Sequence, residues 1–151
     1  MIKLIFLVHV ALTWMLVGLI WTIQVVHYPL FEQVGVETFV NYQRDHMGRI
    51  TQLLLPLMVF ELGTGVVLAL QTPPPIQRNT MWVALGLAIL IWLVTIFINA
   101  PQHGQLAQAF DVNTHRALVQ TNWIRTIIWS IRGLIILWGV WQLLVEIDPN
   151  L

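Results

Sequence analysis

The chain has 151 residues, of which 58% are hydrophobic and only 9% are charged, and its seven basic and seven acidic residues cancel. Soluble domains usually carry about 25% charged residues. This composition therefore excludes a soluble globular protein, a disordered chain and an electrostatic binder of nucleic acid. The eight tryptophans are typical of side chains at membrane interfaces. We predict an integral membrane protein in contact with the lipid bilayer.

Four apolar stretches are long enough to cross a bilayer, which takes roughly 20 helical residues. They cover about residues 2–26, 47–70, 81–98 and 123–144. The Pro-rich segment 72–79 is expected to form a short turn between the second and third stretches, because proline cannot continue a helix. The sequence thus predicts a single domain over residues 1–151: all-α, an integral membrane four-helix transmembrane bundle.

Two longer links, residues 28–46 and 103–120, lie opposite the termini, at what we call the far end of the bundle. The first mixes apolar and polar residues, as a short interfacial helix does. The second is polar, so we expect its His115 to be solvated. Four Lys and Arg residues lie near the far end and two near the terminal end. The positive-inside rule then predicts a cytoplasmic far end and non-cytoplasmic termini, which lie on the same side.

Three ionisable residues fall deep within the apolar stretches, where charge is costly and usually faces the interior of a bundle. Glu61 lies on the second stretch, Arg132 on the fourth and His9 on the first. At the helical rise of about 1.5 Å per residue, Glu61 and Arg132 lie at depths that an arginine side chain can bridge. We predict a buried Glu61–Arg132 ion pair with His9 nearby, serving either helix registry or function.

Polar side chains also gather where the helices reach the far end, which predicts a polar pocket there. Histidine suits proton transfer near neutral pH, whereas arginine and asparagine can stabilise an oxyanion. Tryptophans that share a helical stripe with these residues are candidates for the pocket wall. The predicted catalytic residues are His27, His46, His103 and Arg125, and the predicted substrate-binding residues are Arg49, Asn99, Asn122, Trp92 and Trp129.

The same histidines leave cofactor chemistry open. His27, His46 and His103 could supply three imidazole ligands to a metal ion, and histidines on facing helices could ligate haem. No two of them have the i,i+4 spacing of ligands on one helix. The cofactor is therefore predicted only as none, haem or a metal.

Several short motifs mark the chain: Val26-His27-Tyr28-Pro29-Leu30-Phe31, then Phe39, Ile50 and Leu55-Pro56-Leu57, then Asn99-Ala100-Pro101 with Leu106, and Asn122-Trp123-Ile124-Arg125-Thr126. Together they resemble the anthrone oxygenase-like family of small four-helix bacterial membrane proteins. The resemblance implies a four-helix transmembrane bundle in the bacterial inner membrane. It also implies oxygen-dependent oxidation of an anthrone to an anthraquinone, with roles for Asn99, Asn122 and Arg125. His46, His103 and Arg49 depart from the family pattern.

Three functions are compatible with these residues. The first is binding or oxidation of a lipophilic aromatic or quinone-like molecule in the far-end pocket, which would make the chain an oxidoreductase. The second is a haem- or metal-binding subunit of a membrane redox complex. The third is a non-catalytic structural or accessory membrane protein. A homo-oligomer and a larger membrane complex are both left open by the sequence.

Overall fold

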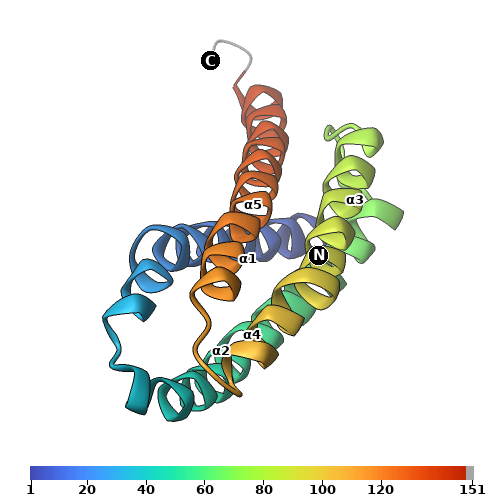
Figure 1. Ribbon diagram of the computed structural model, residues 1–151. Helices are drawn as coiled ribbons and strands as arrows, with labels where there is room; N and C mark the ends of the chain where they lie inside the picture. Colours follow the sequence, from blue (N-terminus) through green and yellow to red (C-terminus); the bar gives the residue numbers. More distant parts are fainter. Residues whose placement is uncertain (149–151) are drawn as a thin grey trace.

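The computed structural model describes residues 1–148 and confirms the predicted all-α, four-helix transmembrane architecture (Figure 1). Within these residues, four helical segments are long and apolar enough to cross a membrane: Ile2–Gln33, Val36–Leu70, Arg78–Leu106 and Val112–Ile147. By their length and composition the chain is an integral membrane protein. Residues 149–151, which the predicted domain includes, lie outside the described residues.

Two of the four segments change their helical geometry near the far end. The first consists of α1 (Ile2–Thr22), the π-helical turn η1 (Ile23–His27) and the 3-10 turn η2 (Pro29–Gln33). The third consists of α3 (Arg78–Val94), the π-helical turn η3 (Thr95–Asn99) and α4 (Ala100–Leu106). The segments α2 (Val36–Leu70) and α5 (Val112–Ile147) are each one α-helix.

Prolines account for both π-helical turns. Pro29 and Pro101 have no backbone N–H, so the carbonyls of Val25 and Phe97, four residues earlier, lose their helical partners. Val25 lies inside η1 and Phe97 inside η3. The wider π-helical turns at these points change which residues are joined by backbone hydrogen bonds, and such turns are frequent at functional sites.

The helices extend well beyond the apolar stretches, so the prediction of two long links at the far end is wrong. The helix α2 begins at Val36 and α5 at Val112, because each helix includes polar residues that precede its apolar stretch. Asp111 begins α5 by accepting a hydrogen bond of 2.7 Å from the backbone N–H of Thr114. This hydrogen bond to Thr114 lowers the pKa of the exposed Asp111 carboxyl.

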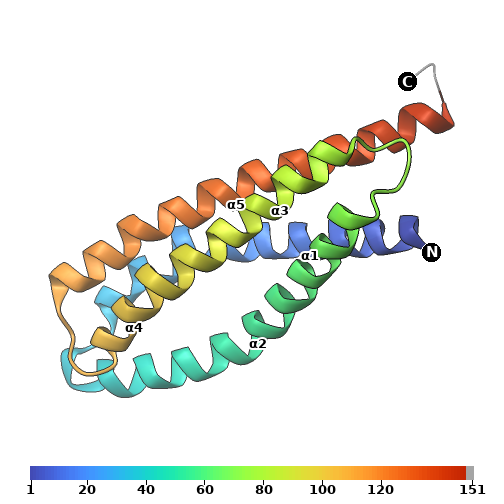
Figure 2. The same ribbon diagram turned by 90° about the vertical axis from the view of Figure 1, so that its right-hand side faces the viewer.

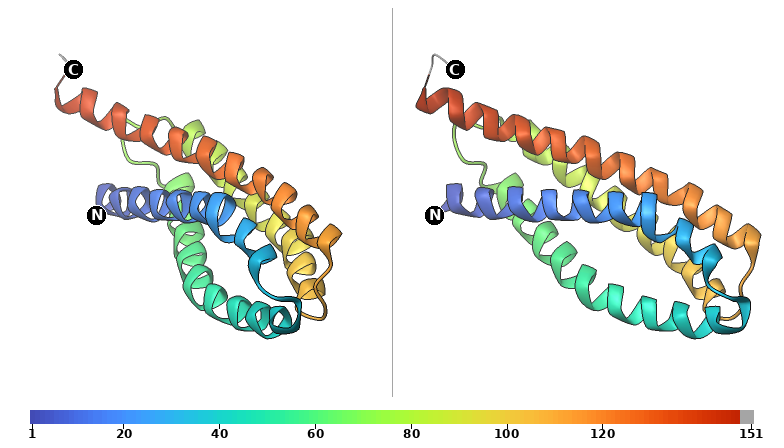
Figure 3. Two further views of the ribbon diagram at one scale, coloured as in Figure 1. Left: turned by 60° about the vertical axis from the view of Figure 1, so that its left-hand side comes forward. Right: turned by 90° about the vertical axis from the view of Figure 1, so that its left-hand side faces the viewer.

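The helices α1 and α3 both pack against α5, and α2 packs against α1 and α3. The start of α1, the end of α5 and the 71–77 turn lie together at one end of the bundle (Figure 2), where Lys3 Nζ is 3.3 Å from Glu146 Oε2. Figures 2 and 3 show α2 bowing away from the other helices. Pro56 lies within α2 and explains the bow, because it removes one backbone donor and crowds the preceding turn.

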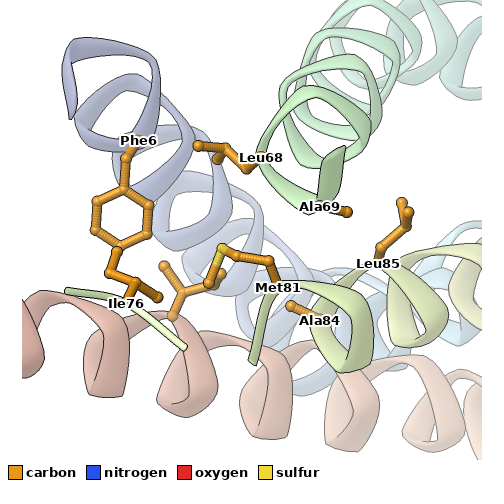
Figure 4. Close-up of a cluster of buried hydrophobic side chains, with 8 residues drawn as sticks. Phe6, Leu68, Ala69, Ile76, Met81, Ala84 and Leu85 are labelled. Carbon is orange, nitrogen blue, oxygen red and sulfur yellow. The ribbon is translucent and has the colours of Figure 1, made fainter. Parts of the chain in front are cut away.

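Three apolar clusters succeed one another along the bundle. The terminal cluster comprises Phe6, Leu68, Ala69, Ile76, Met81, Ala84, Leu85 and Ile136 (Figure 4). The middle cluster comprises Leu16, Val17, Ile20, Met58, Ile91, Ile128 and Trp129. The far cluster comprises Ile23, Tyr28, Phe31, Phe39, Leu106 and Leu118. Polar side chains are buried between these clusters, and there the candidate sites lie.

A glycine permits the close crossing of α1 and α5 at the terminal end. A Cβ atom added to Gly139 would lie 3.0 Å from Phe6 Cζ. Overfilling a packed site costs about 1–3 kcal/mol, so Gly139→Leu is expected to lower the free energy of unfolding by at least this amount. Gly86→Leu is the control, because Gly86 is exposed and an added Cβ would meet no atom of the described residues within 4 Å. Thermal unfolding in detergent compares the two variants, and equal melting temperatures would contradict the prediction.

Candidate functional site

A largely apolar cavity of about 190 Å³ lies between α2 and the segment formed by α3, η3 and α4, on the inner side of the α2 bow. We call it the ligand cavity. Three of its lining residues, Thr51, Leu55 and Ala100, are exposed and belong to the apolar segments Val36–Leu70 and Arg78–Leu106. In a bilayer the ligand cavity would therefore open between these two segments, toward lipid. Its full lining is Tyr28, Met47, Ile50, Thr51, Leu54, Leu55, Met58, Trp92, Thr95, Asn99, Ala100, His103 and Arg125.

His103 and Tyr28 form one hydrogen-bonded unit at the polar end of the ligand cavity. The Tyr28 hydroxyl is 2.7 Å from His103 Nε2, and Gln43 Nε2 is 2.8 Å from His103 Nδ1. The same Gln43 amide nitrogen donates to the His103 carbonyl, at 3.4 Å, so it is the NH₂ group that faces the ring. In the neutral His103 ring, Nδ1 then accepts the hydrogen bond from Gln43. Nε2 carries the ring proton and donates a hydrogen bond to the Tyr28 oxygen. The hydroxyl hydrogen of Tyr28 is thereby left for a ligand.

Arg125 and Asn99 complete the polar end. The buried Arg125 guanidinium lies beside the Tyr28 hydroxyl. Asn99 Nδ2 donates to Thr121 and Gln102, at 3.0 and 3.3 Å. Within residues 1–148, Nε of Arg125 and Oδ1 of Asn99 are buried without a hydrogen-bond partner. An unmet buried polar group costs about 1–3 kcal/mol, so both side chains retain hydrogen-bonding capacity that a ligand could use.

His27 and His46 form a second hydrogen-bonded pair, closer to the membrane face. Nε2 of His27 is 3.0 Å from Nδ1 of His46. The half-buried His27 borders an interfacial cavity of about 430 Å³, which is lined by His27, Tyr42, Asp45, His46, Arg49 and Ile50. Ile50 also lines the ligand cavity, so the two cavities border the same part of α2. The ring centroids of His46 and His103 are 5.7 Å apart.

Of the predicted pocket residues, Trp92, Asn99, His103 and Arg125 line the ligand cavity. Asn122 does not, because its Nδ2 donates to Gln24 Oε1 at 2.8 Å across the η1–α5 contact. Trp129 belongs to the middle cluster, with the Arg132 guanidinium carbon 5.4 Å from its ring centroid. The exposed Arg49 borders the interfacial cavity. The structure thus divides the predicted residues among several places.

Glu61 and Arg132, the pair that helical spacing predicts, form a salt bridge in which the side chains are 1% and 0% exposed. Thr13 donates its hydroxyl hydrogen to Glu61 at 3.0 Å and accepts from Arg132 Nη1 at 3.2 Å. Arg132 Nε donates to the Ala84 carbonyl at 2.9 Å. Helices α1, α2, α3 and α5 are therefore joined at one level. We call this group, together with His9, the deep ionic cluster.

His9 completes the deep ionic cluster. Arg132 Nη2 lies 3.1 Å from Nε2 of His9, and since arginine can only donate, this nitrogen accepts. The proton of the neutral ring is then on Nδ1, which is 2.8 Å from the Thr64 hydroxyl oxygen. None of these side chains belongs to the lining of the ligand cavity. The deep ionic cluster thus has the contacts of a structural element.

The expectation that His115 is solvated is wrong: the residue is 1% exposed. Its Nε2 donates to the Tyr28 carbonyl at 2.9 Å, and its Nδ1 is 3.1 Å from Glu32 Oε1. The early start of α5 causes this burial, because His115 then lies on a helix, against η2, and not in a loop. His115 thereby holds the backbone of the segment that presents Tyr28 to the ligand cavity.

The geometry of the far-end histidines gives no support to a metal or haem site. Among the described residues, no group of three or more His, Cys, Asp and Glu side chains could hold a metal ion. The nitrogens of His27 and His46 face each other, whereas those of His103 face Tyr28 and Gln43. The 3.0 Å between His27 Nε2 and His46 Nδ1 is shorter than the distance of about 4 Å that separates two imidazole nitrogens on opposite sides of one metal ion, at bonds of about 2.0–2.1 Å, so these two nitrogens are not placed as the two axial ligands of a haem.

Comparison of the chain with protein-family models, with curated proteins and with solved structures gives no match. The similarity to the anthrone oxygenase-like family therefore stays a prediction from short motifs.

Sequence reasoning missed Gln43, Glu32 and the site role of Tyr28. Gln43 lies one helical turn before His46, a signal that becomes readable only when α2 is known to begin at Val36. Tyr28 is next to His27 and Pro29 in the sequence, but its contact with His103 joins positions 75 residues apart. The Glu32–His115 contact joins positions 83 apart, without any local signal.

Proposed function

We propose that this membrane protein binds a lipophilic aromatic molecule with a carbonyl oxygen, of the anthrone or quinone type, and acts on it as an oxidoreductase. The observation that carries this proposal is the ligand cavity, which is largely apolar, lies between two apolar helical segments and ends at the hydrogen-bonded unit of Tyr28 and His103, with Arg125 beside it. Small-molecule sites commonly combine apolar walls with a few convergent polar groups in this way.

The walls of the cavity suit a flat ring system. Trp92 offers an aromatic surface on which a ring can stack. Met47 and Met58, on the facing wall of α2, bring thioether sulfurs that make favourable contacts with aromatic edges. A molecule dissolved in the bilayer would enter sideways between α2 and α4 without crossing an aqueous phase.

The polar end suits a carbonyl oxygen, because it presents donors. The hydroxyl hydrogen of Tyr28 and the guanidinium of Arg125 would both point at an acceptor oxygen. Such donors also stabilise the enolate that forms when an anthrone loses its ring-carbon proton. The enolate then reacts with dioxygen, so that one anthrone and one dioxygen give one anthraquinone and one water. The short-motif resemblance supports this chemistry and a place in the bacterial inner membrane, and the positive-inside rule supports a cytoplasmic far end.

The binding step can be tested with 1-hydroxyanthraquinone, whose absorbance changes on binding, and protein in lipid nanodiscs. We expect saturable binding at one site. Ala100→Leu, which narrows the mouth of the ligand cavity, should weaken binding at least tenfold. Ala11→Leu is the matched control, because Ala11 is exposed on α1 and does not line the ligand cavity. Absorbance titration against protein-free nanodiscs measures both affinities.

Two results would contradict the binding proposal. One is a probe that only partitions into lipid, without saturation or sensitivity to Ala100→Leu. The other is displacement of the probe by oleate as readily as by anthraquinone, which would indicate a fatty-acid site. Oxidation is tested separately, by the dioxygen that the nanodiscs consume after anthrone is added, with Ala100→Leu as the blocked reference.

A further inference from the structure

We infer that His103, Gln43, His46 and His27 form a proton path between the polar end of the ligand cavity and the membrane face at the far end. The inference deepens the proposed function and rests on it, because it assigns the route of the protons that a bound ligand oxygen gains or loses. It gives a role to His27 and His46, which lie apart from the polar end of the ligand cavity.

The inner part of the path is the Tyr28–His103 unit. Tyr28 lines the ligand cavity and its oxygen is 2.7 Å from His103 Nε2. When Tyr28 gives its hydroxyl proton to a bound oxygen, the proton on His103 Nε2 can replace it. His103 then needs a proton on Nδ1, the nitrogen that faces Gln43 at 2.8 Å.

The outer part of the path is the His27–His46 pair. The 3.0 Å contact joins Nε2 of His27 to Nδ1 of His46, which leaves Nδ1 of His27 for the interfacial cavity that His27 borders. Asp45 and Arg49 line the same cavity. Their polar side chains mark it as the place where the path meets water.

The two parts meet at the inner edge of His46. Nε2 of His46 and Oε1 of Gln43 are both buried and have no partner within residues 1–148. Both residues lie on one face of α2, one turn apart, and both border His103. A buried water typically makes two to four hydrogen bonds to such groups. One water that contacts His46 Nε2 and Gln43 Oε1 would connect His46 to the Nδ1 edge of His103.

The proton count closes at every step. For each proton that Tyr28 gives to the ligand oxygen, His103 gives one from Nε2. Once the Gln43 amide has turned its NH₂ group away from the ring, His103 gains one at Nδ1 from the water. The water gains one from His46 Nε2, and His46 gains one at Nδ1 from His27 Nε2. His27 gains one from the interfacial cavity. Gln43 can serve both forms of His103, because its amide donates in one orientation and accepts through Oε1 in the other.

The path leads to one side of the membrane. Toward the terminal end, the apolar middle cluster lies between the ligand cavity and the deep ionic cluster. Arg132 is hydrogen-bonded to His9 and paired with Glu61, while His9 contacts Thr64 and Glu61 accepts from Thr13. Within residues 1–148, the polar side chains of the path therefore connect the ligand cavity to the far end and not to the deep ionic cluster.

The first test follows proton arrival at the ligand cavity. 1-Hydroxyanthraquinone, bound in nanodiscs as its coloured phenolate, is mixed with acid in a stopped-flow instrument, and the loss of colour reports its protonation. We expect His46→Phe and His46→Gln to slow the protein-bound phase at least tenfold while the final absorbance stays the same. Asn41→Ala is the control, because Asn41 is exposed on α2 and lines neither the ligand cavity nor the interfacial cavity. An unchanged rate in both His46 variants overturns the inference.

The second test needs no ligand, so it separates the path from the proposed function. In protein labelled with ¹⁵N-histidine, NMR measures how fast the His103 imidazole proton exchanges with water. His46→Gln should slow this exchange at least tenfold, whereas Asn41→Ala should not change it. Fast exchange in His46→Gln overturns the path even if the probe binds. Failure of the probe to bind, with slowed exchange in His46→Gln, overturns the proposed ligand and leaves the path supported.

Discussion

Arg132→Met is expected to destabilise the bundle by about 3–5 kcal/mol, the cost of removing one partner from a buried ion pair. The Glu61 side chain, which is 1% exposed, would then be a buried carboxylate without its cationic partner. The Ala84 carbonyl would also lose the donor that Arg132 Nε supplies at 2.9 Å. Chemical denaturation in mixed micelles, followed by the tryptophan fluorescence of the protein, measures the loss.

The double variant Glu61→Leu/Arg132→Met distinguishes an ion pair from two independent losses. Because the uncompensated charge disappears with its partner, the double variant should be more stable than Arg132→Met alone, and its cost should fall well short of the sum of the two single changes. Recovery should be incomplete, since Thr13 and the Ala84 carbonyl still lack Arg132. Strictly additive costs would show that the pair is not coupled. Recovery would support the registry role of the pair, which joins α2 to α5.

Arg125→Gln is expected to weaken the binding of 1-hydroxyanthraquinone tenfold or more and to leave the binding of anthracene unchanged. Hydrogen bonds from a charged donor contribute about 1.5–3 kcal/mol, and every 1.4 kcal/mol is about a factor of ten in affinity. Anthracene has a related ring system without oxygen, so its affinity should not change when a hydrogen-bond donor is lost. Titration in nanodiscs measures both ligands on the same sample.

Arg116→Gln is the matched control for Arg125→Gln, because it makes the same change on the same helix at an exposed position outside the ligand cavity. A thermal unfolding curve of each variant separates loss of affinity from loss of fold. If Arg125→Gln weakens anthracene and 1-hydroxyanthraquinone equally, the guanidinium shapes the cavity and does not bind an oxygen atom. If it weakens neither, the proposed orientation of the ligand is wrong.

The deep ionic cluster and the ligand cavity differ in how far sequence reasoning reaches them. Glu61 and Arg132 are rare charges in apolar helices, and their depth follows from a constant rise per residue, so their pairing is predictable. The ligand cavity depends on the bend that Pro56 introduces into α2. A helical repeat assigns residues to the faces of a straight helix, so it does not predict this bend. The contact of His27 with His46 depends on which face each helix presents after the wider turn η1, and the contact of His103 with Tyr28 depends on the turns η1 and η3.

The sequence by itself determined that the chain crosses a membrane as four apolar helices and which residues lie at each depth, because hydrophobicity and helical rise are local properties. Only the tertiary structure decided that α2 and α5 continue into the predicted links, that His115 is buried, and that Asn122 contacts Gln24 instead of the ligand cavity. These features depend on helix rotation and bending, which packing between distant segments sets. A repeat of 3.6 residues gives a position on a helix, but the neighbour that faces that position is chosen by the fold.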